Sequence, residues 1–251
     1  MPRPFPGRED PAAREDAECA LGQCDGSGWL PLDDSPNTTR PCPCRERRVN
    51  RALSVRMGSG IPKRFRGVSF ERKPICDLEP SRVQYVRAFV NSIDERIDSG
   101  DGLWFSGDTG TGKTSLAMLV SKAALEAGRS VAIYSVPRLL AEIKATYDRD
   151  SGDSYMQLFR RLCSVDLLHL DDLGAERSTE WVLEQLYAIV NERWQDGRSI
   201  VVTTNITDME ELRGQIGART VSRLVEICGD PLPLYGPDRR IAYDPARSAL
   251  G

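Results

Sequence analysis

The stretch Gly107-Asp-Thr-Gly-Thr-Gly-Lys113-Thr114 is the strongest indicator of fold in this chain. It follows a short apolar run, residues 103–106, and opens a helical pattern that ends at Gly128. Glycines at these spacings let consecutive backbone N–H groups point inward, and the following helix presents its positive dipole end to the same place. This arrangement predicts a loop that binds phosphate groups. A glycine-rich turn without a ligand is the alternative, which the preceding strand and the following helix disfavour.

The motif gives each of its residues an expected task in holding ATP. Lys113 supplies a positive charge to the β and γ phosphates, where hydrolysis takes place, and Thr114 supplies a hydroxyl to Mg²⁺. The rest of the loop contributes mainly its backbone. The residues expected to bind ATP here are Gly107, Asp108, Thr109, Gly110, Thr111, Gly112, Lys113, Thr114 and Ser115.

A second pattern is an apolar strand that ends in two carboxylates, Asp171 and Asp172. We expect Asp171 to hold Mg²⁺, usually through water, and Asp172 to orient or deprotonate the water that attacks the γ-phosphate. An acidic turn at the end of a strand is the alternative. His169, the only histidine of the chain, lies in the same run and is predicted to be a core or second-layer residue.

Further polar residues downstream have weaker signals. Asn205 follows the apolar run 199–204 and is a candidate to contact the attacking water and the γ-phosphate, although turn chemistry also explains it. Arg219 and Arg223 are four residues apart on a predicted helix and share one face, which suits either solvent or the phosphates of a neighbouring subunit. Arg239 and Arg240 near the end have the same ambiguity.

Strand and helix patterns alternate along the core, which predicts the α/β class with a parallel sheet covered by helices on both faces. A brief strand or hairpin is expected after residue 227. The expected strands are 103–106, 130–136, 165–170 and 199–204, and the expected helices are 81–97, the one ending near 127, 137–147, 180–194 and short ones within 208–227.

The composition suits one sizeable domain with a small appendage. The chain has 251 residues, of which 40% are hydrophobic, and a net charge of -3. No stretch approaches the 18 or so apolar residues of a membrane span, so we expect a cytoplasmic protein with no membrane partner. The expected divisions are a disordered tail (1–17), a cysteine-rich zinc module (18–46), a basic linker (47–66) and an ATPase domain (67–251).

Four cysteines form two pairs near the N-terminus, Cys19 with Cys24 and Cys42 with Cys44. Two thiol pairs across a loop favour structural Zn²⁺, with free surface thiols as the alternative. Residues 40–66 contain nine Lys or Arg and one acidic residue. Their positive charges could bind a phosphate backbone, offset the negative charge of a Zn(Cys)₄ centre, or belong to a solvated linker. The remaining cysteines are expected to be isolated thiols.

Together these motifs resemble the AAA+ ATPases of the DnaC/DnaI helicase-loader group, over about residues 60–243. The resemblance implies a P-loop NTPase AAA+ core preceded by a small N-terminal zinc-binding module. It also implies that Asn205 is sensor 1, that Arg223 is an arginine finger acting in trans with Arg219 as a second arginine, and that Arg240 is sensor 2 in cis. Many AAA+ proteins have Glu where Asp172 stands, so we expect slow turnover that assembly stimulates.

The function implied by this resemblance is loading of a replicative hexameric helicase onto single-stranded DNA during replication. ATP, Mg²⁺ and Zn²⁺ would be the cofactors, and the protein would self-associate into an ATP-dependent oligomer. One alternative is an IstB-type transposition helper that binds duplex DNA, and another is an ATP-switched adaptor with little turnover. The cysteine module favours the helicase loader.

Overall fold

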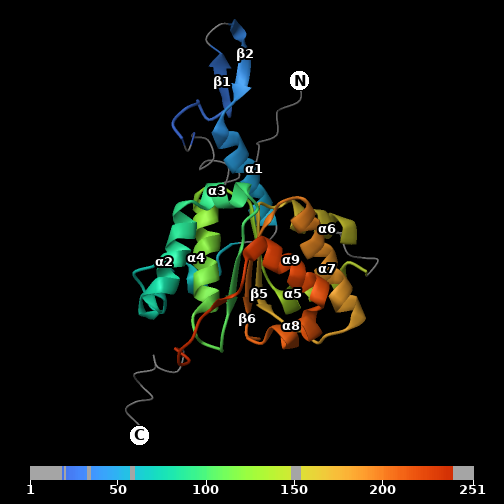
Figure 1. Cartoon of the computed structure of the whole chain (residues 1–251). Coiled ribbons are helices and arrows are strands. Elements are labelled where there is room, and N and C mark those ends of the chain that lie inside the picture. Colours follow the sequence, from blue (N-terminus) through green and yellow to red (C-terminus); the bar gives the residue numbers. More distant parts are fainter. Residues whose placement is uncertain (1–18, 20, 33–34, 57–59, 148–153, 240–251) are drawn as a thin grey trace, which may run out of the picture.

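A five-stranded parallel sheet is the centre of the fold in the computed structural model, which describes residues 19, 21–32, 35–56, 60–147 and 154–239 (Figure 1). The strand order is β4-β5-β6-β3-β7, and every pairing between neighbours is parallel. The predicted α/β class is confirmed. The strands are β3 (Leu103–Ser106), β4 (Val131–Ser135), β5 (Leu167–Leu173), β6 (Ser199–Thr204) and β7 (Leu232–Pro233).

Helices cover both faces of this sheet, as the left and right sides of Figure 1 show. Two apolar cores result, because strands that are buried on both faces pack side chains in both directions. Helices α2 (Pro80–Asn91), α3 (Ile93–Asp98) and α4 (Lys113–Glu126) pack on one face. Helices α5 (Val136–Ala145), α6 (Tyr155–Ser164), α7 (Glu180–Gln195), α8 (Met209–Ile216) and α9 (Ala218–Cys228) pack on the other.

Within the core, the structure differs from the expected elements in two places. The helix expected over 81–97 is divided at Ser92, whose φ of -114° is not helical and whose Oγ donates to the Ala88 carbonyl at 3.2 Å. Helix α6 was not predicted. Its sequence signal is a capping box, in which Ser154 and Gln157 each accept the other's backbone N–H.

A hairpin and a helix precede the core. Strands β1 (Trp29–Leu32) and β2 (Ser35–Pro41) pair antiparallel, and α1 (Pro43–Arg56) runs from them to the sheet (Figure 1). Two short 3₁₀ helices, Lys63–Phe65 and Ile75–Asp77, then lead to α2. Within the described residues, no helix is long and apolar enough to cross a membrane.

The last turns of α1 are anchored on the edge strand β4. The Ser54 hydroxyl, which is buried, accepts the N–H of Val131 at 2.9 Å, and the Asn50 amide donates to the Gly128 carbonyl at 3.1 Å. Leu53 packs against the apolar core on the α5 to α9 face. Much of the basic stretch expected to be a linker is therefore helical and attached to the core.

Candidate nucleotide-binding site

The carboxyl ends of three neighbouring strands bring the predicted site residues to one edge of the sheet. Ser106, the last residue of β3, pairs with Thr204, the last residue of β6, and β5 ends beside them. The phosphate loop leaves β3, while Asn205 follows β6 directly and is exposed. Ligands bind outside the carboxyl ends of strands in open parallel sheets.

The backbone of the glycine loop has the shape that its sequence predicts. Gly110 and Gly112 have φ values of 80° and 100°, which residues with a side chain rarely adopt. Gly112 caps α4 without a side-chain hydrogen bond, and the helix begins at Lys113. The first N–H groups of a helix have no partner within it, so this end of α4 suits an anion.

Lys113 lies inside this loop. Its side chain is 4% exposed, and Nζ donates to the carbonyls of Gly107 and Asp108 at 2.7 Å each. The hydroxyl of Thr111 donates to the same Asp108 carbonyl at 2.9 Å. A positive charge is therefore held among the backbone groups that would surround a phosphate.

Asp171 lies next to Thr114, the other expected Mg²⁺ residue. The Thr114 hydroxyl donates to Asp171 Oδ1 at 3.1 Å, and the Thr203 hydroxyl donates to the same oxygen at 2.7 Å. Burial raises the pKa of Asp171, but contacts from His169, Thr203 and Thr114 outweigh it, so the pKa lies below its usual value. An ionised carboxylate beside a hydroxyl is a donor set that fits Mg²⁺.

His169 lies behind Asp171. It is fully buried, its Nδ1 is 2.9 Å from Ser121 Oγ, and its Nε2 is 3.8 Å from Asp171 Oδ1. The Ser121 hydroxyl also lies 3.0 Å from the Ala117 carbonyl, to which it donates. The position of His169 agrees with the expected second-layer role.

Asp172 lies where the pairing of β5 with β6 is interrupted. Its φ is 57°, which makes it the one residue other than glycine with a positive φ among the described residues. The pairing of β5 with β6 shifts between Leu170 and Leu173, so Asp171 and Asp172 form a bulge.

Known proteins match this chain over the same core. A model of the IstB-like ATP-binding protein family matches residues 52–222. The chain belongs to this family. A relative of this chain is the replicative helicase loader DnaC of Escherichia coli strain K12, which is 32% identical over 181 residues that cover 70% of this chain and 72% of DnaC. The resemblance to the DnaC group is thus confirmed.

Two solved structures show the fold shared within the family. The DnaC helicase loader matches with a TM-score of 0.61 and 24% identity, covering 69% of this chain and 100% of that one. DnaI matches with a TM-score of 0.56 and 23% identity, covering 71% of this chain and 94% of that one. The sheet and the helices that cover it therefore have the fold of DnaC and DnaI.

The arginines predicted to act on ATP lie in different parts of the structure. Arg223 on α9 pairs with Glu226 at 2.7 Å and lies over the Trp194 ring at 3.5 Å from its centroid, while Arg219 is exposed. The hydrogen bonds and ion pairs of the described residues do not join either arginine to the phosphate loop. The N–H of Arg239 donates to the Gly110 carbonyl at 3.2 Å, and Arg240 lies outside the described residues.

The four N-terminal cysteines come together although their two pairs are separated in sequence. All four Sγ atoms lie within 4.8 Å of one another, with Cys19 and Cys42 at 3.8 Å and Cys24 and Cys44 at 3.5 Å. A tetrahedral Zn²⁺ with Zn–S bonds of about 2.3 Å separates its sulfurs by about 3.8 Å. The geometry and the ligand type both fit zinc.

Backbone and side-chain donors surround these thiols. Hydrogen bonds from the backbone, foremost that of Cys24, lower the pKa of Cys19 to about 6, and the Gln23 N–H is 3.3 Å from its sulfur. Arg48 donates to the Gly26 carbonyl at 2.9 Å and reaches Cys44 Sγ at 4.0 Å. These donors favour the thiolate of Cys19, the form that binds metal, whereas burial and the neighbouring thiols raise the pKa of Cys44 to about 12.

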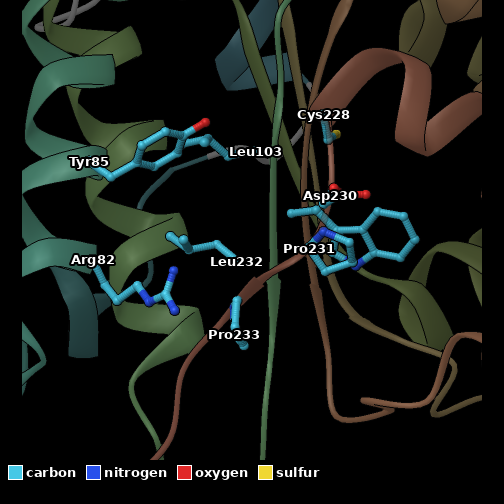
Figure 2. A pocket seen from close by; sticks show the side chains of 9 residues that line it. Arg82, Tyr85, Leu103, Cys228, Asp230, Pro231, Leu232 and Pro233 are labelled. Atoms are coloured by element: carbon cyan, nitrogen blue, oxygen red, sulfur yellow. The ribbon is translucent and has the colours of Figure 1, made fainter.

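A separate pocket of about 220 Å³ lies between α2 and the segment that follows α9 (Figure 2). Figure 2 shows Arg82 and Tyr85 on the α2 side and Pro231 and Pro233 on the other. The predicted nucleotide residues do not line it. The predicted nucleotide residues lie instead at the carboxyl ends of β3, β5 and β6.

The residue that sequence reasoning passed over is Thr203. Asn205 received the expected role in the Thr203-Thr204-Asn205 run, yet Thr203 is the one that bonds Asp171. The sequence did contain a signal for Thr203. It stands at the carboxyl end of the strand after β5, and in a parallel sheet that end can lie beside the two aspartates. The pairing of β5 with β6 was needed to use this signal.

Proposed function

We propose that this protein binds ATP and Mg²⁺, hydrolyses ATP slowly, and loads a replicative hexameric helicase onto single-stranded DNA in the cytoplasm. The relation to DnaC over 181 residues supports this proposal most directly. The geometry of Lys113, Thr114 and Asp171 supports the ATP-binding part of it.

The chain has residues for each part of the hydrolysis site. The loop from Gly107 to Ser115 would hold the phosphates, with Thr114 and Asp171 on Mg²⁺, which would neutralise developing charge when bound. Asp172 would orient or deprotonate the attacking water, and Asn205 would contact it from the neighbouring strand. The short Asp172 side chain is the physical reason to expect slow turnover.

Assembly would complete the site. Arg223 is joined to Glu226 and Trp194 on α9, so in this proposal it serves the nucleotide of a neighbouring subunit, with Arg219 beside it on the same helix. Arg240 would act in cis as sensor 2. Hydrolysis would therefore depend on an ATP-dependent oligomer.

The cysteine module, residues 18–46, would be the head of the protein, the part that binds the helicase or DNA. Its four thiolates would bind Zn²⁺, and the metal would stabilise a module too small to bury a core of its own. Helix α1 connects this head to β4, so the head is held by the ATPase core. A partner bound at the head would then be placed in a defined position.

Transfer of helicase to closed circular single-stranded DNA tests the proposal. Purified hexameric helicase from the same host is mixed with the protein, ATP and the circle, and helicase bound to the circle is measured. We expect co-purification of the two proteins and ATP-dependent transfer, with the Lys113→Ala variant failing to transfer. Binding only to a transposase or to duplex DNA would contradict the loader function.

The match to the IstB-like family supports a second candidate function, a transposition helper that assembles on duplex DNA. ATP-dependent binding to duplex DNA in the absence of helicase distinguishes it. A third reading, an adaptor switched by ATP, predicts nucleotide binding with hardly any turnover even in the assembled state.

A further inference from the structure

Asp171 and Asp172 face a single residue of the neighbouring strand. The pairing of β5 with β6 holds up to Leu170 and resumes at Leu173, and between these points Thr203 alone lies opposite the two aspartates. A bulge of this kind changes the direction of the side chains beside it and is common next to active sites. Asp171 still pairs with Ser135 of β4, but on the β6 side the regular ladder is missing, so side-chain contacts have to hold the two aspartates there.

The hydroxyl of Thr203 bonds to both aspartates. Its Oγ1 donates to Asp171 Oδ1 at 2.7 Å and accepts the backbone N–H of Asp172 at 2.9 Å. Thr203 is fully buried, so water does not compete for either bond. One buried hydroxyl thus fixes the side chain of Asp171 and the left-handed backbone of Asp172.

Three groups approach the same oxygen of Asp171. Thr114, Thr203 and His169 lie 3.1, 2.7 and 3.8 Å from Oδ1. In the part of the chain that the structure describes, Oδ2 has no hydrogen-bond partner. The carboxylate is therefore oriented through one oxygen, which leaves the other for a ligand.

We infer that Thr203 is a positioning residue for ATP hydrolysis, acting through Asp171 and Asp172. The inference rests on the proposed ATPase function, since it assigns Thr203 to the same site. Partners that orient metal ligands change metal affinity or activity by about 10- to 100-fold when they are removed. Valine has nearly the shape of threonine but can neither donate to Asp171 nor accept from Asp172.

The next residue supplies a matched control. Thr204 is also fully buried, and its hydroxyl also makes one bond in each direction, to the Leu173 carbonyl at 2.7 Å and from the Ile206 N–H at 3.1 Å. It does not contact either aspartate. Thr204→Val therefore removes as many buried hydrogen bonds as Thr203→Val without touching the carboxylates.

The test compares Thr203→Val, Thr203→Ser and Thr204→Val in the full chain under assembled conditions. Thr203→Val is expected to lower turnover by about 10- to 100-fold and to raise the Mg²⁺ concentration needed for half-maximal rate. Thr203→Ser should restore most of both, and Thr204→Val should stay near wild type. Normal turnover and Mg²⁺ dependence in Thr203→Val, or equal losses in both valine variants, would overturn the inference.

Hydrogen exchange of the Asp172 amide adds a readout that needs no nucleotide. Thr203→Val should speed exchange at this amide, while Thr204→Val should not. Unchanged exchange in Thr203→Val would refute the positioning role whatever the turnover. If the wild-type protein did not bind ATP, the proposed function would fail, and the exchange result would still decide whether Thr203 holds the bulge.

Discussion

The ammonium group of Lys113 is held where a phosphate group would lie. A charge that is 4% exposed is stable only with close partners, and here two carbonyls of its own loop, at 2.7 Å, supply them. Phosphate oxygens would be stronger partners, because a hydrogen bond between two charged groups is stronger than one to a neutral carbonyl. Nucleotide binding would thus replace the two carbonyl partners of the Lys113 ammonium group with more strongly bound phosphate oxygens.

We predict that Lys113→Ala lowers ATP affinity by about 100-fold or more, because it removes charge-assisted hydrogen bonds from a buried site. Titration with a fluorescent ATP analogue measures this. Lys122→Ala is the control, since Lys122 lies on the same helix but bonds the Val68 carbonyl and Glu126. Equal affinity of Lys113→Ala and wild type would contradict the phosphate-binding role of this loop.

At the scale of elements, sequence patterns predict the helices, strands and loops that are determined by residues close together in the chain. The glycine loop and the strand before Asp171 are continuous in sequence, so their structure can be predicted from local spacing. Helix α6 has a capping box and buried Leu158 and Leu162 at helical spacing, so its local signal was present in the sequence but was not used. The bulge opposite Thr203 depends on strand pairing between residues 31 apart or more, so sequence patterns do not reveal it.

The cysteine module is a case where spacing predicts the ligand set and the fold supplies the geometry. Its two thiol pairs meet because the hairpin of β1 and β2 returns the chain, and Cys44 lies at the start of α1. Two of the four thiols, Cys42 and Cys44, are buried. Burying thiols this close without a metal or a disulfide gives no evident stabilisation, which also favours Zn²⁺.

We predict about one Zn²⁺ per chain in protein purified under reducing conditions, because the four sulfurs match tetrahedral zinc. Elemental analysis measures it. Cys42→Ser should lose the metal, whereas Cys76→Ser should keep it, since Cys76 is exposed and outside the cluster. Reduced protein that holds no zinc would rule the site out.

At the scale of the whole molecule, α1 joins the two candidate sites. Its first turn contains Cys44, and its last turn contains Ser54, which bonds β4 of the parallel-sheet core. A helix of 14 residues is about 21 Å long. The head and the nucleotide site are therefore linked by regular structure, so assembly of the cores would arrange the heads in a fixed pattern.

If the protein assembles as proposed, the position of Arg223 has a consequence for hydrolysis. Arg223 is held by Glu226 and Trp194, and the described contacts do not connect it to the phosphate loop of its own chain. If it acts on a neighbour, the residues for one hydrolysis site come from two chains. An arginine that stabilises transferring phosphate raises turnover by orders of magnitude, so its loss should affect rate far more than binding.

We predict that Arg223→Ala binds ATP normally but turns it over at least about 10-fold more slowly under assembled conditions. Arg213→Ala on α8, where the arginine is exposed and pairs with Glu210, should behave as wild type. Mixing is the decisive measurement, because Lys113→Ala chains lack the phosphate lysine but keep Arg223. A mixture of Lys113→Ala and Arg223→Ala chains should therefore exceed the rate of either alone, since some sites combine an intact loop with an intact arginine. A mixture no faster than the average of the two variants would show that Arg223 does not act across subunits.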